Sequence, residues 1–179
     1  MTARLPGLVL GNSREPKATL EILRDRREGV AAGIAMMREI APGFELGTTP
    51  LLEVEGRLQR LPDVPMRRLK ANLVNRDLTL AGRDAMNSGD LKRVGDLLTA
   101  HHTQLRDGLE LSTPKIERML RAALSAGALG GKINGSGGGG CMFVLAPGRE
   151  QDTAEAIRRE DADAWIVKVD SGAEFRIEE

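Results

Sequence analysis

The sequence has very few aromatic residues: three Phe, one Trp and no Tyr among 179 residues. Proteins that bind single-stranded nucleic acids use aromatic side chains as stacking platforms, and this chain has almost none. Its 26 basic and 26 acidic residues cancel, so it also lacks the broad positive field on which nucleic-acid binding depends. We therefore expect no nucleic-acid partner, and we expect ligands to be recognised by backbone amides and polar side chains.

Cysteine and long apolar runs are scarce as well. Cys141 is the only cysteine, which excludes an internal disulfide and a cysteine-rich metal site. His101 and His102 have no cysteine or histidine partners at ligand spacing, so we expect them on a helix surface or between helices, with no metal bound. No apolar run approaches the roughly 20 residues that span a bilayer, and residues 1–6 carry no signal-peptide core. These features predict a cytoplasmic protein without a membrane-spanning segment.

Apolar periodicity and turn residues predict a mixed helix and strand fold. Helices are expected at residues 20–40, 65–86, 90–105, 114–124 and 149–160. Strands are expected at residues 8–10, 141–145, 165–169 and 174–177, the last two forming a hairpin around 170–172. Five scattered Gly and Pro residues predict an irregular connection at 43–62. The result is an α+β fold, a small antiparallel sheet with helices on one face, in a single domain of residues 1–179.

A glycine loop between the fourth helix and the strand at 141–145 is the one stretch that indicates chemistry. Residues 130–141 read Gly-Gly-Lys-Ile-Asn-Gly-Ser-Gly-Gly-Gly-Gly-Cys. A flexible linker has this composition, but the run stands directly between an amphipathic helix and an apolar strand. A dinucleotide fingerprint requires a strand before the loop and a helix after it, the reverse of the predicted order. A Walker A loop would need Gly at Ala126 and Ser or Thr at Ile133.

A loop built for close approach is the remaining interpretation. Five glycines in residues 135–140 leave Ser136 as the only side chain, so backbone N–H groups can converge on an anion or lie against another backbone. We predict that this loop lies next to a nucleotide or substrate. Its residues are Asn134, Gly135, Ser136, Gly137, Gly138, Gly139 and Gly140.

The same loop carries a resemblance to a known family. Residues 132–141, followed by an apolar strand, resemble the third motif of the GHMP kinases, which include galactokinase and mevalonate kinase; Asn134 stands at the usual Thr and Ser136 at the usual Ala. The segment 97–107, ending in Leu-Arg-Asp, is similar to a galactokinase segment. The segments 110–116 and 126–132 resemble the helix opening and the lead into the third motif. The resemblance is strong from about 65 to 147 and weak before 60.

The resemblance implies the C-terminal domain of an enzyme that uses ATP and Mg²⁺ to phosphorylate a small alcohol. It favours a galactokinase-like sugar kinase, with a mevalonate-type alcohol as the alternative substrate. The family's first motif, its phosphate loop and the aspartate base have no counterpart in this sequence. We therefore expect no catalytic residue here, no tight binding of ATP to this chain alone, and a need for an N-terminal phosphate-loop domain in cis or in trans. The alternative is a non-catalytic truncated product or partner subunit.

The missing domain leads to two further expectations. Apolar surface near the glycine loop should promote self-association. We also expect residues 135–140 to be mobile. If the loop faces empty solvent at unstrained dihedral angles, Gly138→Val should leave the fold of the lone domain almost unchanged. We expect Cys141 to be inert in packing, and Asp107 and Glu110 to be charges at a helix end.

Overall fold

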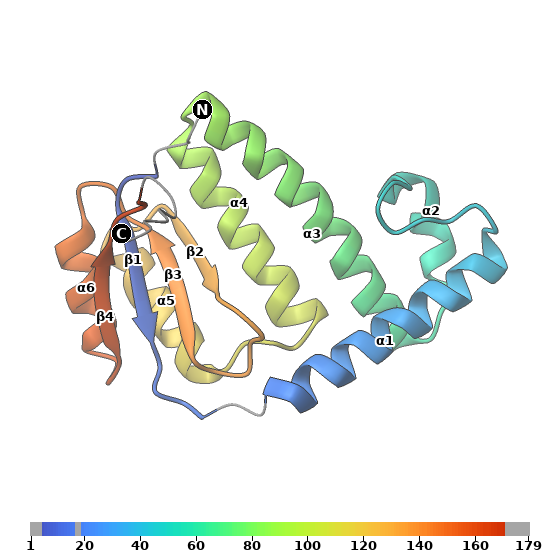
Figure 1. The fold of residues 1–179 in the computed structure, drawn as a ribbon, viewed down its shortest axis with the longest axis horizontal. Helices are drawn as coiled ribbons and strands as arrows, with labels where there is room; N and C mark the ends of the chain where they lie inside the picture. Colours follow the sequence, from blue (N-terminus) through green and yellow to red (C-terminus); the bar gives the residue numbers. More distant parts are fainter. Residues whose placement is uncertain (1–4, 17–18, 171–179) are drawn as a thin grey trace, which may run out of the picture.

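The computed structural model describes residues 5–16 and 19–170, which form a four-stranded sheet and a set of helices (Figure 1). The strands are β1 (Leu8–Asn12), β2 (Gly130–Ile133), β3 (Cys141–Leu145) and β4 (Asp163–Val167). The helices are α1 (Thr19–Ile40), α2 (Leu51–Leu58), α3 (Asp63–Ser88), α4 (Leu91–Thr103), α5 (Pro114–Ser125) and α6 (Glu150–Arg158), with a π-helical turn, η1 (Gln104–Gly108), directly after α4.

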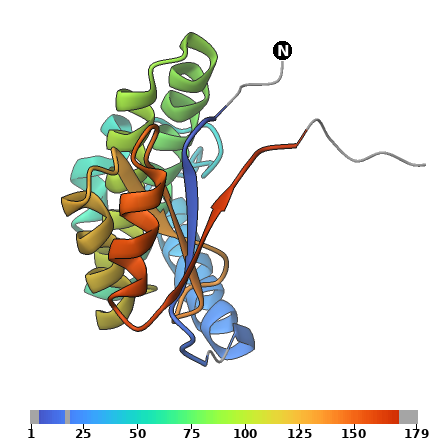
Figure 2. The same cartoon turned by 90° about the vertical axis from the view of Figure 1, so that its left-hand side faces the viewer.

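The sheet is antiparallel throughout, with the strand order β2-β3-β1-β4. Helices α5 and α6 cover one of its faces, while none of the described helices covers the opposite face over β1 and β4 (Figure 2). The covered face holds the main core, in which alternate strand residues are fully buried against the two helices. That core includes Val9, Met142, Ile116, Met119 and Ile157. The α+β fold with helices on one face is confirmed, and the apolar run at 141–145 is a central strand, as expected.

Capping residues mark the start of α4, the start of α5 and the end of α3. The Asp90 side chain accepts a hydrogen bond from the Arg93 amide at 2.9 Å and caps α4. Thr113 caps α5 in the same way, with Pro114 in the first turn. Gly89 ends α3 in the left-handed conformation, φ +74°.

The expectation of an irregular connection at 43–62 is wrong, because α2 lies within it. Val54 and Leu58, one turn apart, are both about 1% exposed and pack into a second core. Gly56 stands on an exposed side of the helix and has open space around it. One glycine costs a helix only about 1 kcal/mol, which the burial of two aliphatic side chains offsets. Helices α1 and α2, which contribute to this second core, lie on the side of the molecule away from the sheet (Figure 1).

The expectation of a glycine loop running without interruption from the end of α5 to Cys141 is also wrong. Residues 130–133 form the edge strand β2, which pairs with β3, and α4 packs closely against it. The glycines that weaken the strand signal are needed here, because a Cβ atom at Gly130 would lie 1.8 Å from the carbonyl oxygen of Gly95. The predicted strand at 174–177 and its hairpin turn from 171 onward lie outside the described residues.

Helix α4 is shorter than the predicted helix at 90–105, since its last turn continues as η1. No described helix combines the length and hydropathy that crossing a bilayer requires.

Candidate functional site

The loop that joins β2 to β3, residues 134–140, has a backbone that glycine alone adopts without strain. The φ angles of its five glycines are all positive, between +72° and +111°. Side chains disfavour this region because Cβ approaches the backbone carbonyl. The glycine run is therefore required by the path of the chain and is not a flexible spacer.

Backbone hydrogen bonds hold the loop to two distant segments. The Gly138 amide donates to the carbonyl of Leu111, just before α5, at 2.7 Å. The Gly140 carbonyl accepts from the Ser13 amide, just after β1, at 2.8 Å. The loop thus lies where three segments far apart in sequence meet.

The inner side of the loop touches protein atoms. A Cβ atom at Gly137 would lie 2.6 Å from Cβ of Leu111, and one at Gly138 would lie 2.2 Å from Cδ1 of Ile22 on α1. A Cβ at Gly139 would lie 2.9 Å from Cβ of Glu15. The condition that the loop faces empty solvent at unstrained angles is therefore wrong, and with it the expectation that Gly138→Val leaves the fold unchanged.

The outer side of the loop offers hydrogen-bond donors. Asn134 and Gly135 are exposed, and Ser136 is half-buried. Within the described part of the chain, the amides of Ser136, Gly139 and Gly140 donate to no protein acceptor. Backbone amides that have no protein acceptor suit the oxygen atoms of a phosphate or another anion.

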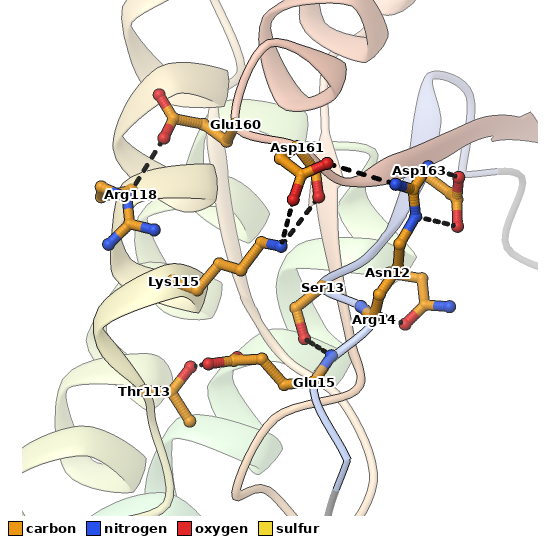
Figure 3. A network of polar contacts seen from close by, with 10 residues as sticks. All are labelled: Asn12, Ser13, Arg14, Glu15, Thr113, Lys115, Arg118, Glu160, Asp161 and Asp163. Carbon is orange, nitrogen blue, oxygen red and sulfur yellow. Dashed lines mark hydrogen bonds and ion pairs between the residues drawn. The ribbon is translucent and has the colours of Figure 1, made fainter.

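A polar network below the loop fixes its neighbours (Figure 3). The Thr113 hydroxyl donates to the Glu15 carboxylate at 2.6 Å and accepts from the Ile116 amide. The buried Ser13 hydroxyl accepts from the Glu15 amide at 3.2 Å. A carboxylate at the N-terminus of α5 is stabilised by the helix dipole. Glu15 therefore ties the end of β1 to the start of α5, directly beside Gly139.

Ion pairs extend this network to β4 (Figure 3). The Arg14 guanidinium donates to Asp163 at 2.5 and 3.0 Å and to Asp161 at 3.3 Å. Its hydrogen bond lowers the pKa of Asp163. The Lys115 ammonium donates to the Asp161 carbonyl at 2.8 Å. These exposed contacts are structural, since each charge is paired within the network.

His102 supports the loop from the other side. It is 5% exposed, and its Nδ1 accepts from the Ile133 amide at 3.2 Å. Its Nε2 lies 2.7 Å from Oε1 of Glu117, which also accepts from the Ser112 hydroxyl at 2.5 Å. Because Nδ1 is an acceptor, the proton of the neutral ring is on Nε2. The expected position between helices is confirmed, but His102 also fixes the residue that precedes the loop.

Asp107 and Glu110 follow α4, as expected of charges at a helix end. Asp107 pairs with Arg106 at 2.6 Å and Glu110 with Arg67 at 3.1 Å. The hydrogen bond from Arg106 lowers the pKa of Asp107.

Comparison with known proteins places this site in a family. Residues 72–165, which include the loop and both strands beside it, match the family model described as GHMP kinases C terminal. The chain belongs to the GHMP kinase family.

Relatives with two different activities are similar in sequence to this GHMP kinase domain. Mevalonate kinase of Pyrococcus horikoshii is 35% identical over 128 residues, covering 70% of this chain and 38% of that protein. Galactokinase of Streptomyces coelicolor is 32% identical over 144 residues, covering 79% of this chain and 35% of that protein. The chain thus spans well under half the length of the curated relatives it matches.

The fold of the GHMP kinase domain is also that of a solved galactokinase. The Lactococcus lactis enzyme, complexed with galactose, superposes with a TM-score of 0.83 over 96% of this chain and 47% of that one. At 21% identity, this likeness shows the fold alone.

The described residues of this GHMP kinase domain do not fit a magnesium site. Magnesium takes oxygen ligands, carboxylates among them, and residues 134–140 contain no Asp or Glu. The nearest carboxylate that we find beside the loop, Glu15, is held by Thr113. Within residues 5–16 and 19–170, no three His, Cys, Asp or Glu side chains are grouped as metal ligands. Oxygen ligands for Mg²⁺ would have to come from elsewhere.

Both histidines of the domain are held neutral. Burial, together with the nearby Lys132 and His102, lowers the pKa of His101 to about 4. Burial also lowers the pKa of His102, although its hydrogen bond to Glu117 acts in the opposite direction.

We expect the stability of this domain to fall as the pH decreases from 7 to 5. An unfolded histidine takes up a proton near pH 6.5, whereas the folded His101 does so only near pH 4. The unfolded state then binds more protons, and the free energy of unfolding decreases as the pH falls. His101 should contribute about 1 kcal/mol of this loss after allowance for its partial exposure to solvent. Urea unfolding at several pH values measures it.

His101→Gln is the variant that tests this cause. Since the sequence has only two histidines, the variant should keep the part of the pH dependence due to His102 and lose the rest. An unchanged slope between pH 7 and 5 would show that His101 is already solvated in the folded state.

Proposed function

We propose that this chain forms the C-terminal wall of an interdomain active site in which a GHMP kinase transfers the γ-phosphoryl group of ATP to a small alcohol. The observation that carries the proposal is the two-sided loop at 134–140. Leu111, Ile22 and Ser13 fix its inner side, and the amides of Ser136, Gly139 and Gly140 have no acceptor among the described residues. A rigid surface of this kind can position phosphate oxygens at no cost in loop ordering.

The loop would act by positioning and by its dipoles. Phosphoryl transfer depends mainly on alignment and on stabilising the charge of the transferred group. The amides of Ser136, Gly139 and Gly140 are the donors available for that charge. Among the described residues, no side chain at the loop is placed as a general base, because Glu15 is committed to Thr113. The base, the phosphate loop and the Mg²⁺ ligands would come from an N-terminal domain, in cis or in trans.

A sugar is the favoured acceptor of the phosphoryl group. The galactokinase relative aligns with 79% of this chain, and residues 105–107 carry the Leu-Arg-Asp of the galactokinase segment. A mevalonate-type alcohol is the second candidate, because the mevalonate kinase relative is slightly more identical, at 35%. Use of ATP would place the enzyme in the cytoplasm under either proposal.

Exposed leucines beside the loop support an interface with the missing domain. Leu20 is 83% exposed and Leu23 is 50% exposed, on the same helical turns as Ile22, which contacts Gly138. Covering these side chains would be favourable by about 25 cal/mol for each Å² of apolar surface. The same surface would drive self-association of the lone domain.

The test is to measure kinase activity with and without an N-terminal domain. We expect no turnover by the chain alone, and a dissociation constant for ATP weaker than about 10 μM. A chimera that joins it to the N-terminal domain of the Streptomyces coelicolor galactokinase should phosphorylate galactose. The N-terminal domain alone is the control, and mevalonate is the competing substrate.

Three outcomes separate the alternatives. Turnover by the chain alone would contradict the two-domain site. Turnover with a chimera built on a mevalonate kinase, but not on the galactokinase, would replace the sugar with mevalonate. A folded chimera of either kind that binds ATP without turnover would support the non-catalytic alternative.

A further inference from the structure

A pocket separate from the glycine loop opens between α3, α4 and β2. Its volume is about 250 Å³. Most of its lining is apolar, and the walls come from two facing helices. The main apolar side chains are Leu78 and Met86 of α3 and Leu97 and Leu98 of α4. A polar end is formed by His101 of α4 and Lys132 of β2.

Lys132 gives the pocket one positive charge that the domain does not neutralise. Its ammonium donates to the carbonyl of Ile133 at 2.9 Å and lies 5.4 Å from the centre of the Phe143 ring. Among the described residues, no carboxylate forms an ion pair with it. A half-buried ammonium held by one carbonyl and one ring keeps capacity for further hydrogen bonds, since it has three donors. Its surroundings therefore favour an anion.

His101 adds a hydrogen-bonding group without a second charge. It is half-buried and neutral at pH 7, because burial lowers its pKa to about 4. One positive charge and one neutral polar group match a monovalent anion better than a phosphate, which carries up to two charges.

The volume limits the size of the ligand. If each non-hydrogen atom takes up roughly 30 Å³, the share of a water molecule in the liquid, the pocket holds about eight such atoms. Because the pocket is open on one side, the end of a chain one or two carbons longer, by the same rough estimate, extends into solvent. Most of them must be carbon to match the leucine and methionine walls.

We propose that the pocket between α3, α4 and β2 binds a small monocarboxylic acid, with its carboxylate at Lys132 and an apolar chain of about six to eight carbons between the two helices. The site shares no residue with loop 134–140, although Lys132 opens the motif at 132–141.

Octanoate is the probe, tested with the full 179-residue chain by calorimetry. We expect a dissociation constant of roughly 0.1–1 mM, in the range of small ligands of this size. 1-Octanol, which has the same chain without the charge, should bind about tenfold more weakly. Butyrate, which has the charge without the chain, should also bind at least tenfold more weakly.

Two variants locate the ligand. Lys132→Met keeps the length of the side chain and removes its charge, and it should weaken octanoate binding about tenfold while leaving 1-octanol unchanged. Gly82→Leu should abolish binding of both, because Gly82 lines the pocket and a Cβ there meets no atom within 4 Å. Leu is a better helix former than Gly, so this variant should keep its fold. Gly56→Leu on α2, where the space is also open, is the matched control.

A methyl NMR spectrum gives an independent readout. Octanoate should shift the signal of Met86, which lines the pocket, and leave that of Met37, which is fully buried in the second core, in place. No binding up to about 5 mM, equal affinity for octanoate and 1-octanol, or unchanged binding by Gly82→Leu would each overturn the proposal.

Discussion

Replacing Gly130 with Val is expected to separate α4 from the sheet and to destabilise the domain by more than about 4 kcal/mol. A Cβ atom at this position would lie 1.8 Å from the carbonyl oxygen and 2.4 Å from the carbonyl carbon of Gly95. Both atoms belong to the backbone of α4, so no side-chain rotation can relieve the overlap. Since domains of this size are stable by only about 5–15 kcal/mol, much of the protein should be unfolded.

Urea unfolding, followed by circular dichroism, measures this loss. Gly56→Ala is the control, because its helical position has open space, and it should be neutral or stabilising by up to about 1 kcal/mol. The proposed contact is contradicted if the free energy of unfolding of Gly130→Val lies within about 1 kcal/mol of that of the parent protein, since core substitutions typically cost more. In that case α4 does not approach β2 as closely as described.

Replacing Gly138 with Val is expected to destabilise the lone domain by about 2–4 kcal/mol, because two effects add. The φ angle of +72° costs a branched side chain about 1–2 kcal/mol. The new Cβ would also lie 2.2 Å from Cδ1 of Ile22, and such overpacking typically costs about 1–3 kcal/mol. Urea unfolding of the parent and variant domains measures the sum.

The two effects can be measured separately. Ile22→Ala removes the overlapping atom, so Gly138→Val should lose less stability in that background than in the parent domain. The double-mutant cycle should give a coupling energy of about 1–2 kcal/mol, which is the steric part of the loss. Gly89→Val is the matched control for backbone strain, because Gly89 has φ +74° and no atom within 4 Å of its Cβ position. Equal losses for Gly138→Val and Gly89→Val would mean that Ile22 does not restrain the loop.

The expectation that Gly138→Val is harmless failed for a reason that applies to any glycine-rich segment. The composition of residues 135–140 shows that side chains are excluded, but not what excludes them. Here the inner side is filled by Leu111, by Ile22 and by Glu15. All three are far from the loop in sequence, so no local pattern announces the contact.

His102 shows the same limit at a single residue. A lone histidine on a helix carries no sign of its partners, which are Ile133 and Glu117. Helix α4, strand β2 and helix α5 must pack together before the His102 ring has both a hydrogen-bond donor, the Ile133 amide, and an acceptor, the Glu117 carboxylate. The role of His102 in holding the start of the loop therefore depends on tertiary structure.

The sequence by itself determined the features that depend on neighbouring residues. Capping side chains such as Asp90 and Thr113 set where α4 and α5 begin, because they bond to amides three residues away. The apolar runs at 8–10 and 141–145 predicted the two central strands, and the motif at 132–141 indicated the family and the candidate loop.

The tertiary structure decided what depends on distant residues. It made 130–133 an edge strand against α4, because Gly95 and Gly130 face each other there and a Cβ atom on either would overlap the opposite backbone. It made α2 a helix despite Gly56, because Val54 and Leu58 are buried in the second core. It also decided which side of the loop at 134–140 is filled by other segments, since Leu111, Ile22 and Glu15 lie against its inner side.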